Sequence, residues 1–438
     1  MGSVIVAGGG LAGMASAAAL YTAGFQVEVF EARGYPGGRA TSYSLPGEDA
    51  LIDNCQHILL RCCVNLIDFY QRLGVADKIR FYREFYFIEP GGGTSVLRGG
   101  PLPAPLHLMG SFLRLGILGL SDKFAIARAL MAVRRDRLRR RDLDRVTILD
   151  WLNEQGQTPA AIARFWRPIL VSAINEEPER IAALHGLQCI HLGFLASSCS
   201  YEMGVPSAPL SELYRPESWS ALPGVFLRLR APVDRILVEN GRAVGVHCAG
   251  EQRLADAVIC AVPFERVHGL VPDLNLDFTA WEHSPITGIH LWFDRPVTGL
   301  PHATLLERTI QWFFNKSGGR YLQIVVSASR NLVEMPRSEV IDLAVRELGE
   351  FLPSVRAARL ERAHVVKEIR ATFSARPGLQ ALRPEPRTAI GGLYLAGDWT
   401  RTAWPATMEG AVRSGYRAAE AVAADAGVRA SFLLPDIG

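Results

Sequence analysis

Apolar and polar positions at the start of the chain predict a strand, a helix and a second strand. Residues 4–7 form a short β-prone run, and the alanine-rich stretch from Met14 to Leu20 has the composition of a helix. Residues 26–30 form the next apolar run, which ends at Glu31. Strands that alternate with a helix in this way predict a parallel sheet.

The middle of the chain is expected to be mainly helical. Residues 64–73 carry apolar side chains at helical spacing, and residues 147–200 continue the helical pattern. Residues 79–98 alternate enough to predict a hairpin that turns at the three glycines 91–93. A proline-rich loop at 101–108 leads into a further helical region that ends near Arg141.

Strand patterns return in the second half of the chain. The Asn240-Gly241 pair between β-branched runs predicts a hairpin, and a fully apolar run such as 257–263 is typical of a buried parallel sheet. The other elements expected there are strands at 225–230, 288–293, 321–328, 363–368 and 393–396, and helices at 338–351 and from Thr407 to Ala424.

A glycine-rich loop joins the first strand to the first helix. It has the spacing G-x-G-x-x-G, in which the glycines permit a tight turn, a close approach of the backbone to a pyrophosphate, and close packing of the helix on the strand. An acid at the end of the second strand can accept the hydroxyls of an adenosine ribose. The residues expected to hold a dinucleotide here are Gly8, Gly10, Leu11, Ala12, Gly13 and Glu31.

A second glycine pair follows that acid. The segment continues through Ala32 and Arg33 to Gly37, Gly38 and Arg39, so that a flexible backbone could fold over the ligand while a guanidinium points at its charge. We therefore include these five residues in the predicted cofactor site.

Polar groups gather between apolar neighbours at residues 53–57. Asp53, Asn54, Gln56 and His57 would all need hydrogen-bond partners if they were buried, and the edge of a cofactor would supply them. Gln56 and His57 are therefore predicted to line the cofactor site.

The end of the chain offers a second anchor. A strand ends in Gly397-Asp398, which places a carboxylate where it could bind a polyol. The helix that begins near Thr407 and Met408 would then direct free amides and a positive dipole at an electron-rich ring.

Composition and charge exclude several classes of function. The formal charge of +3 over 438 residues gives no reason to expect a nucleic-acid partner. The seven cysteines show neither disulfide-framework nor zinc spacing, so no metal is expected and the thiols are predicted to be reduced. No run is long enough to span a membrane, and the early first strand argues against a secretory signal, so we expect a cytoplasmic protein.

One stretch favours contact with a membrane surface. Residues 106–131 are rich in Leu, Phe and Met, and six arginines lie between Arg134 and Arg141. Apolar residues beside a basic cluster can lie on an anionic membrane, here the inner face of the cytoplasmic membrane, although a solvated helix face would also explain them.

Together these motifs resemble the FAD-binding half of the amine oxidase and phytoene desaturase superfamily. The resemblance rests on the N-terminal glycine loop, on Gly37-Gly38-Arg39 and on Gly397-Asp398. It implies FAD bound in an extended form, with the adenine against the backbone of Val233, the ribityl and phosphate region near Asp398, and the flavin at Thr407 and Met408.

The resemblance also implies how the chain divides. We expect an α/β fold with a Rossmann-like FAD-binding domain built from residues 1–60, 215–275 and 385–428. A second, α+β substrate domain with a mixed sheet and helices would take residues 61–214 and 276–384, and residues 429–438 would form a C-terminal tail.

A narrower resemblance is to the hydroxysqualene dehydroxylase branch. It covers residues 53–57, 102–107, 209–213 and the Gly-Asp-Trp-Thr strand end, with Cys55 standing where that branch is expected to have glycine. It implies that reduced FAD converts hydroxysqualene to squalene in a long, apolar substrate site. The chain has a single dinucleotide fingerprint, so no second site for NADPH is visible and the external electron donor is unknown.

The resemblance leaves the proton donor open between His57, Asp53 and His107, of which His57 is preferred. Replacing His57 by Ala or Gln is expected to abolish turnover while FAD stays bound. The alternatives for the whole protein are a carotenoid or dehydrosqualene desaturase, a non-redox flavin-dependent mutase and a prenyl-binding carrier.

Overall fold

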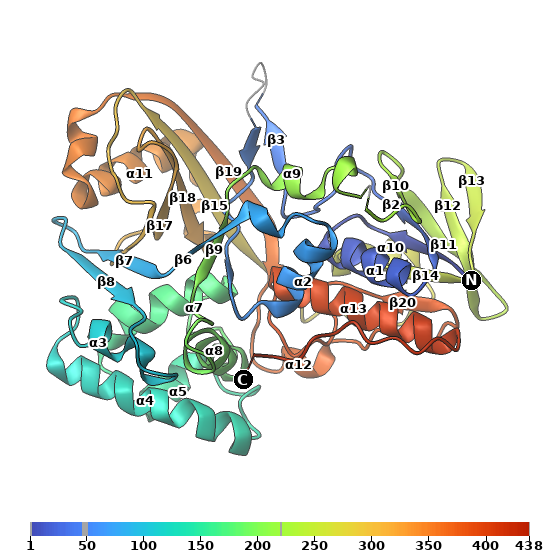
Figure 1. Ribbon diagram of the computed structural model, residues 1–438, viewed down its shortest axis with the longest axis horizontal. Coiled ribbons are helices and arrows are strands. Elements are labelled where there is room, and N and C mark those ends of the chain that lie inside the picture. The colour runs from blue at the N-terminus through green and yellow to red at the C-terminus, as the bar shows by residue number, and fades with distance from the viewer. Residues whose placement is uncertain (1, 46–50, 220, 438) are drawn as a thin grey trace.

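The computed structural model describes residues 2–45, 51–219 and 221–437. Residues 1, 46–50 and 220 of the predicted FAD-binding domain and residue 438 of the predicted C-terminal tail lie outside the described residues. Figure 1 shows two units side by side, with a parallel sheet and its helices on the right and a mixed sheet with a helical layer on the left.

The unit on the right is built on a five-stranded parallel sheet in the order β10-β2-β1-β14-β20. Its strands are β1 (Ser3–Ala7), β2 (Gln26–Phe30), β10 (Val225–Arg228), β14 (Ala257–Cys260) and β20 (Leu393–Leu395). Every pairing in this sheet is parallel. The sequence segments that supply it are far apart, as the dispersed apolar runs predicted.

Two helices from opposite ends of the chain pack together beside this sheet. They are α1 (Leu11–Thr22) and α13 (Met408–Asp425), drawn next to each other in Figure 1. Their backbones approach so closely that a Cβ added to Gly415 would lie 2.2 Å from the carbonyl oxygen of Ala12. The C-terminal helix is thereby fixed against the helix that carries the glycine loop.

A seven-stranded mixed sheet forms the second unit, in the order β19-β15-β18-β17-β16-β7-β8. Its strands are β7 (Glu84–Ile88), β8 (Thr94–Arg98), β15 (His283–Phe293), β16 (His302–Leu305), β17 (Trp312–Ser317), β18 (Tyr321–Ser327) and β19 (Leu360–Phe373). One face carries Ile289, Phe313 and Ile324, which are buried together with Val340 and Leu348 of α11 (Arg337–Phe351).

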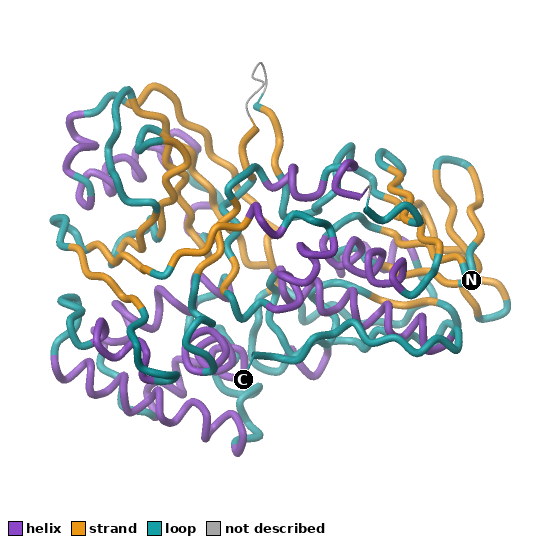
Figure 2. The backbone as a smooth tube through the Cα atoms, in the orientation of Figure 1, coloured by secondary structure: helices purple, strands orange, loops and turns teal. Residues whose placement is uncertain are grey.

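Helices between residues 109 and 195 form a layer at the lower left of Figures 1 and 2. The helical prediction for this region is confirmed, but a break at residues 113–119 separates α3 from the long helix α4. The helices are α3 (Met109–Phe112), α4 (Leu120–Arg139), α5 (Ile148–Glu154), α6 (Pro159–Ala161), α7 (Arg167–Ile174) and α8 (Ala183–Ile190).

The predicted hairpin over residues 79–98 is only partly right. Strands β7 and β8 pair antiparallel around the glycines, but β6 (Ile79–Tyr82) pairs instead with β9 (Met203–Pro206). The same strand β9 also pairs with β5 (Leu59–Leu60). Alternation within a strand shows that it has two different faces, but it cannot identify a partner more than 120 residues away.

The remaining elements are short. The Asn240-Gly241 hairpin is confirmed as β11 (Val233–Glu239) and β12 (Arg242–Cys248), which β13 (Glu251–Leu254) extends. Elsewhere the chain forms β3 (Ser42–Ser44), β4 (Leu51–Asp53), α2 (Val64–Arg72), α9 (Leu210–Tyr214), α10 (Phe264–Leu270) and α12 (Leu379–Leu382).

Candidate active site

The two glycine segments meet at the start of α1. Gly10 is the N-cap of α1, where no side chain caps the helix, and it forms a parallel β-bridge with Gly37. A Cβ on Gly38 would lie 3.1 Å from the Cα of Gly10, whereas a Cβ on Gly10 would meet nothing closer than 4.0 Å. Side chains are thus absent where a pyrophosphate would lie against the helix amides, and the loop fits a dinucleotide.

The other two glycines of the G-x-G-x-x-G motif, Gly8 and Gly13, are required for different reasons. Gly8 has a φ of 114°, which side chains rarely allow. A Cβ on Gly13 would lie 2.0 Å from the carbonyl oxygen of Gly8, so the helix can follow the strand this closely only without a side chain there. Leu11 and Ala12 continue the helix behind Gly10, and both are buried.

Glu31 holds the glycine loop from the side. Its Oε2 accepts a hydrogen bond of 2.8 Å from the Gly9 amide, and its Oε1 accepts one of 2.8 Å from the Arg33 amide. The Ala231 amide donates to the Glu31 carbonyl at 2.9 Å, so the strand that begins at Val233 starts beside this acid. The residues predicted for the adenosine end therefore lie close together, with Ala32 and Arg33 exposed.

Arg39 joins the two predicted anchors of the cofactor site. Its Nη2 lies 2.6 Å from Asp398 Oδ1, across 359 positions of sequence. Asn54 Nδ2 donates to the Arg39 carbonyl at 2.7 Å and brings the segment 53–57 to the same place. The polar cluster, the second glycine pair and the C-terminal strand end thus converge.

We expect that replacing Arg39 by Met will lower the free energy of unfolding by about 1–2 kcal/mol, because the Asp398 carboxylate, only 4% exposed, loses its charged partner. The loss should lie at the lower end of the range for buried charges because the Arg39 side chain is 36% exposed. Urea unfolding measures it, with the exposed Arg33→Met as the control. Equal stability of the two variants would contradict this account of the pair.

The C-terminal anchor is held by α13. The Gly397 amide donates to Ser414 Oγ at 2.8 Å, which fixes the strand end against the helix. Thr407 is the N-cap of α13 and accepts the Gly410 amide at 3.0 Å, so its hydroxyl shapes the start of the helix. Met408 is the first residue of the helix and packs against the core around α1.

The buried Asp53 carboxylate accepts three hydrogen bonds. Its Oδ1 accepts from Ser42 Oγ at 2.7 Å and from the Leu210 amide at 2.9 Å. Its Oδ2 accepts from Lys316 Nζ at 3.2 Å, and the same ammonium donates to Gln56 Oε1 at 2.9 Å. Asp53 is itself fixed by these bonds and thereby holds the ammonium of Lys316, a residue that the sequence analysis did not single out.

His57 stands beside this lysine with a neutral ring. Its Nδ1 lies 3.0 Å from the Cys55 carbonyl, which can only accept, so Nδ1 carries the proton. Burial lowers the pKa of His57 and keeps the imidazole uncharged at neutral pH. Burial also raises the pKa of the Cys55 thiol to about 12, so the departure from the expected glycine adds an uncharged, buried side chain.

The mixed sheet presents a polar row to the segment 53–57. Four residues lie directly opposite one another across β16, β17, β18 and β15 and therefore share one face of the sheet. They are the polar His302, Gln323 and His290, with Phe314 between His302 and Gln323. Gln323 Nε2 lies 3.4 Å from the Asp53 carbonyl. A Cβ on Gly288, two residues from His290, would lie 2.9 Å from the Asn54 carbonyl. This face of the sheet thus lies against the polar cluster.

His107 lies away from this cluster, in an aromatic group. It belongs to the short helical turn η2 (Leu106–Leu108), and its ring centroid is 5.4 Å from that of Tyr201. Tyr201, Phe194 and Trp312 all surround Phe85, with centroid distances of 6.3–6.4 Å. Neither ring nitrogen of His107 has a hydrogen-bond partner among the described residues, and burial lowers its pKa.

The protonation state of His302, which lies in the polar row of the mixed sheet, can be tested through the pH dependence of stability. It is 1% exposed, and burial lowers its pKa to about 4. As the pH falls below 6.5, the unfolded chain binds a proton at this site before the native protein does, so stability is lost until the native pKa is reached. Between pH 7.5 and 4.5 this loss amounts to about 2.5 kcal/mol.

We expect His302→Phe to reduce the loss of stability between pH 7.5 and 4.5 by about that amount. Urea unfolding at both pH values measures it, and the exposed His268→Phe provides the control. If His302→Phe loses as much stability on acidification as the parent protein, His302 is not neutral in the native state.

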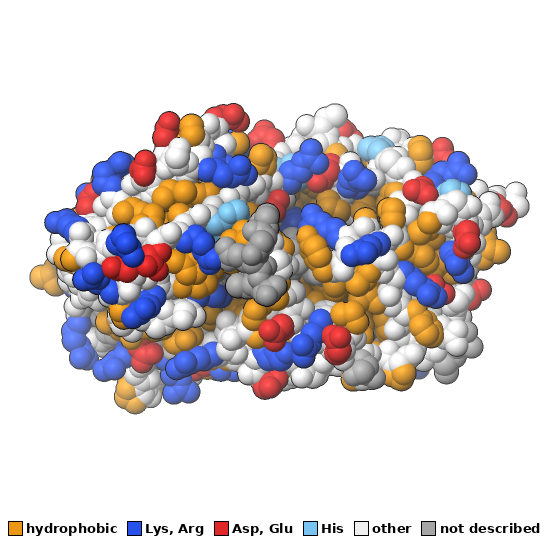
Figure 3. Space-filling model, turned by 90° about the horizontal axis from the view of Figure 1, so that it is seen from above, with side chains coloured by type: hydrophobic (Ala, Val, Ile, Leu, Met, Phe, Trp, Pro, Cys, Tyr) orange, Lys and Arg blue, Asp and Glu red, His pale blue; other side chains and the backbone are white. Residues whose placement is uncertain are grey.

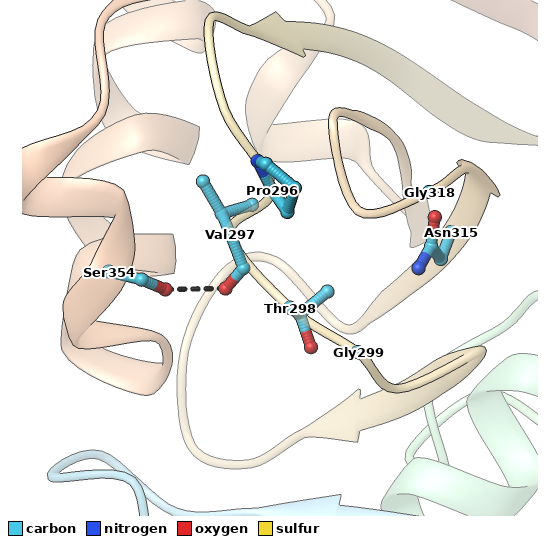
Figure 4. A pocket seen from close by; sticks show the side chains of 7 residues that line it. All are labelled: Pro296, Val297, Thr298, Gly299, Asn315, Gly318 and Ser354. Atoms are coloured by element: carbon cyan, nitrogen blue, oxygen red, sulfur yellow. Dashed lines mark hydrogen bonds between the residues drawn. The ribbon is translucent and has the colours of Figure 1, made fainter.

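A surface pocket of about 540 Å³ lies apart from these residues, and Figure 4 shows it from close by. Its lining is formed by the loop after β15, the end of β17 and the turn at Ser354, whose hydroxyl donates to the Val297 carbonyl. None of the residues predicted from the sequence lines it. In the described part of the chain no cluster of acids, histidines and cysteines could hold a metal ion.

The residues that sequence reasoning missed come from the mixed sheet. Gln323, His290 and His302 are buried in strands with mostly buried positions, where polar residues are unusual, and Lys316 is half-buried near the end of β17. For His302 and Gln323 the signal is a polar side chain at alternate positions of β16 and of the start of β18. Lys316 stands among consecutive polar residues at the end of β17, and the sequence gives no such signal there.

Comparisons with known proteins agree with this fold. The chain is 32% identical to a hydroxysqualene dehydroxylase from Rhodopseudomonas palustris, over 96% of this chain and 98% of that protein. It is 24% identical to a probable zeta-carotene desaturase from Synechococcus elongatus, over 96% and 98% of the two chains.

Solved structures show the same architecture. An oxidoreductase from Methanosarcina mazei superposes with a TM-score of 0.73 at 20% identity, over 94% of this chain and 98% of that one. A putrescine oxidase superposes with a TM-score of 0.71 at 18% identity, over 97% and 99%. At these identities the likeness concerns the fold alone.

The family signature extends over nearly the whole chain. The family described as flavin containing amine oxidoreductase matches residues 11–423, which include α1, the mixed sheet and most of α13. Because this match covers far more than half of the sequence and agrees with the architecture, the protein is an enzyme of the flavin-containing amine oxidoreductase family.

Proposed function

We propose that the protein is an FAD-dependent oxidoreductase that reduces hydroxysqualene to squalene, a step of squalene and hopanoid synthesis. The observation that carries this proposal is the 32% identity to a hydroxysqualene dehydroxylase over nearly the full length of both chains. The desaturases that match 96% of this chain are 23–26% identical to it, and two of them are covered to only 78% of their own length.

The residues that would hold FAD follow from the two glycine segments. The amides at the start of α1 would bind the pyrophosphate, and Glu31 would bind the adenosine ribose. Arg39 and Asp398, paired at 2.6 Å, would border the middle of the cofactor, with the start of α13 toward the flavin. When bound and reduced, FAD supplies the hydride that replaces the hydroxyl of the substrate.

The reaction balances as a reductive substitution. With reduced FAD bound, the allylic C–O bond would break as the hydroxyl takes up one proton and leaves as water, and the cofactor would supply the hydride for the new C–H bond. The carbon centre carries delocalised positive charge in between, so the site must exclude water. A site for an apolar C30 chain would have to be long and mostly apolar.

Lys316 is the proton donor that the geometry supports best. An ammonium group has three N–H donors, and Asp53 and Gln56 account for two of them. His57, the donor preferred from the sequence, is neutral because burial lowers its pKa, and it therefore lacks the extra proton that a donor releases. We propose that Asp53 and Gln56 hold Lys316 toward the leaving hydroxyl.

The alternative is a carotenoid or dehydrosqualene desaturase, in which the same fold removes hydrogen from a polyene. The desaturases in the comparisons match 95% or more of this chain, which keeps this alternative open. Incubating oxidised protein with dehydrosqualene precursors and carotenes, and reduced protein with hydroxysqualene, separates the two. We expect a product only from the reduced protein with the alcohol; new double bonds in a polyene would favour the desaturase.

A further inference from the structure

Helix α4 is apolar on two opposite sides. Ile126, Ala129 and Val133 on one side are completely buried. On the other side Leu120, Phe124, Met131 and Leu138 are between 75% and 80% exposed. Surface helices of globular proteins usually carry polar residues on the side away from the core. An exposed apolar side of this size is typical of a surface that binds another molecule or a membrane.

The exposed residues form one straight line. Positions 120, 124, 127, 131 and 138 follow helical spacing, with the exposed Arg134 between the last two, and the 20 residues of α4 extend over about 30 Å. The preceding segment adds Leu106, Met109 and Leu113, which are 42–57% exposed. We call the surface formed by Leu106, Met109, Leu113 and the exposed residues of α4 the α3–α4 face. In Figure 1, α3 and α4 lie at the lower left edge of the molecule.

Basic residues border the line on both sides. By helical position Arg128, Arg135 and Arg139 lie along one side of it, and Lys123 and Arg134 along the other. Nine of the chain's 47 basic residues but only two of its 44 acidic residues fall within positions 101–141, so the rest of the chain is net acidic. The surface seen in Figure 3, by contrast, mixes acidic and basic side chains.

We propose that the α3–α4 face lies on the surface of an anionic lipid bilayer, with the apolar line among the acyl chains and the arginines at the lipid phosphates. A helix parallel to the membrane needs such an apolar line with cations on its flanks. A second copy of the chain fits less well, because two strongly basic faces would repel each other. The proposal does not depend on the identity of the substrate.

The FAD-loaded protein can be tested by sedimentation with lipid vesicles. We expect it to bind vesicles that contain phosphatidylglycerol at least tenfold more tightly than vesicles of phosphatidylcholine alone. The double variant Phe124→Ser/Met131→Ser and the charge variant Arg134→Glu/Arg139→Glu should each lose at least tenfold in binding to phosphatidylglycerol. Leu254→Ser removes a side chain of similar exposure, 71%, from β13 and should change nothing.

FAD content and the midpoint of urea unfolding confirm that each variant is folded, and the comparison of the two lipids needs no variant at all. Equal binding to both lipids, or full binding by either double variant, would overturn the proposal. So would a dimer, seen by sedimentation without lipid, that Phe124→Ser/Met131→Ser converts to monomers: the occupant would then be a second copy.

Discussion

Replacing Gly10 by Val is expected to prevent FAD from binding while the protein still folds. The backbone of Gly10 is extended, with a φ of −77°, which any residue can adopt. A Cβ there meets only the Cα of Gly38, at 4.0 Å, so no neighbour in the protein is displaced. The branched side chain would instead occupy the space between the two glycine segments that the pyrophosphate needs.

We expect the affinity for FAD to fall at least about 100-fold, or roughly 2.7 kcal/mol. Titration of the apoprotein with FAD measures the affinity, and urea unfolding of the apoprotein confirms that the fold is kept. Gly269→Val is the matched control, because a Cβ on this exposed glycine of α10 also meets nothing within 4 Å. Normal FAD binding by Gly10→Val would show that the pyrophosphate lies elsewhere.

The second large effect concerns the proton donor. Lys316→Met should lower the rate of dehydroxylation by about 10²–10⁴-fold, the range typical of a lost general acid, with FAD content unchanged. Lys316→Arg keeps a cation beside Asp53 but cannot release a proton near neutral pH, so it should stay almost as slow as Lys316→Met. A purely structural role of Lys316 would instead lower stability and substrate affinity together.

His57→Gln provides the comparison in the same assay. If Lys316 is the donor, His57→Gln should lower the rate less than tenfold, in contrast to the abolished turnover expected from the sequence. If His57→Gln abolishes turnover and Lys316→Met does not, the assignment from the structure is wrong and the one from the sequence is right.

The sequence predicted the parts of the site that lie in contiguous residues. The glycine loop is recognisable because a strand, a tight turn and a helix follow one another within 20 residues, and each constrains the next. The Asn240-Gly241 hairpin is predictable for the same reason, since the turn chemistry is local.

Contacts between distant residues could not be predicted in this way. Lys316 meets Asp53 across 263 positions, and only the register of β16, β17 and β18 brings it there. The sequence singled out the apolar stretch 106–131 and its basic end, but not the side of α4 that is exposed. Apolar residues on both sides of a helix do not reveal which side the core buries, and only the packing of Ile126 and Val133 decides it.

The central claim is that this protein passes a hydride from reduced FAD to an allylic alcohol. The most direct measurement is an anaerobic reaction of the photoreduced, FAD-loaded protein with hydroxysqualene, followed by flavin absorbance and product analysis. We predict one squalene for each FAD reoxidised, with no desaturated product. Reduced flavin that persists beside unchanged hydroxysqualene, while the oxidised protein desaturates a polyene, would contradict the claim.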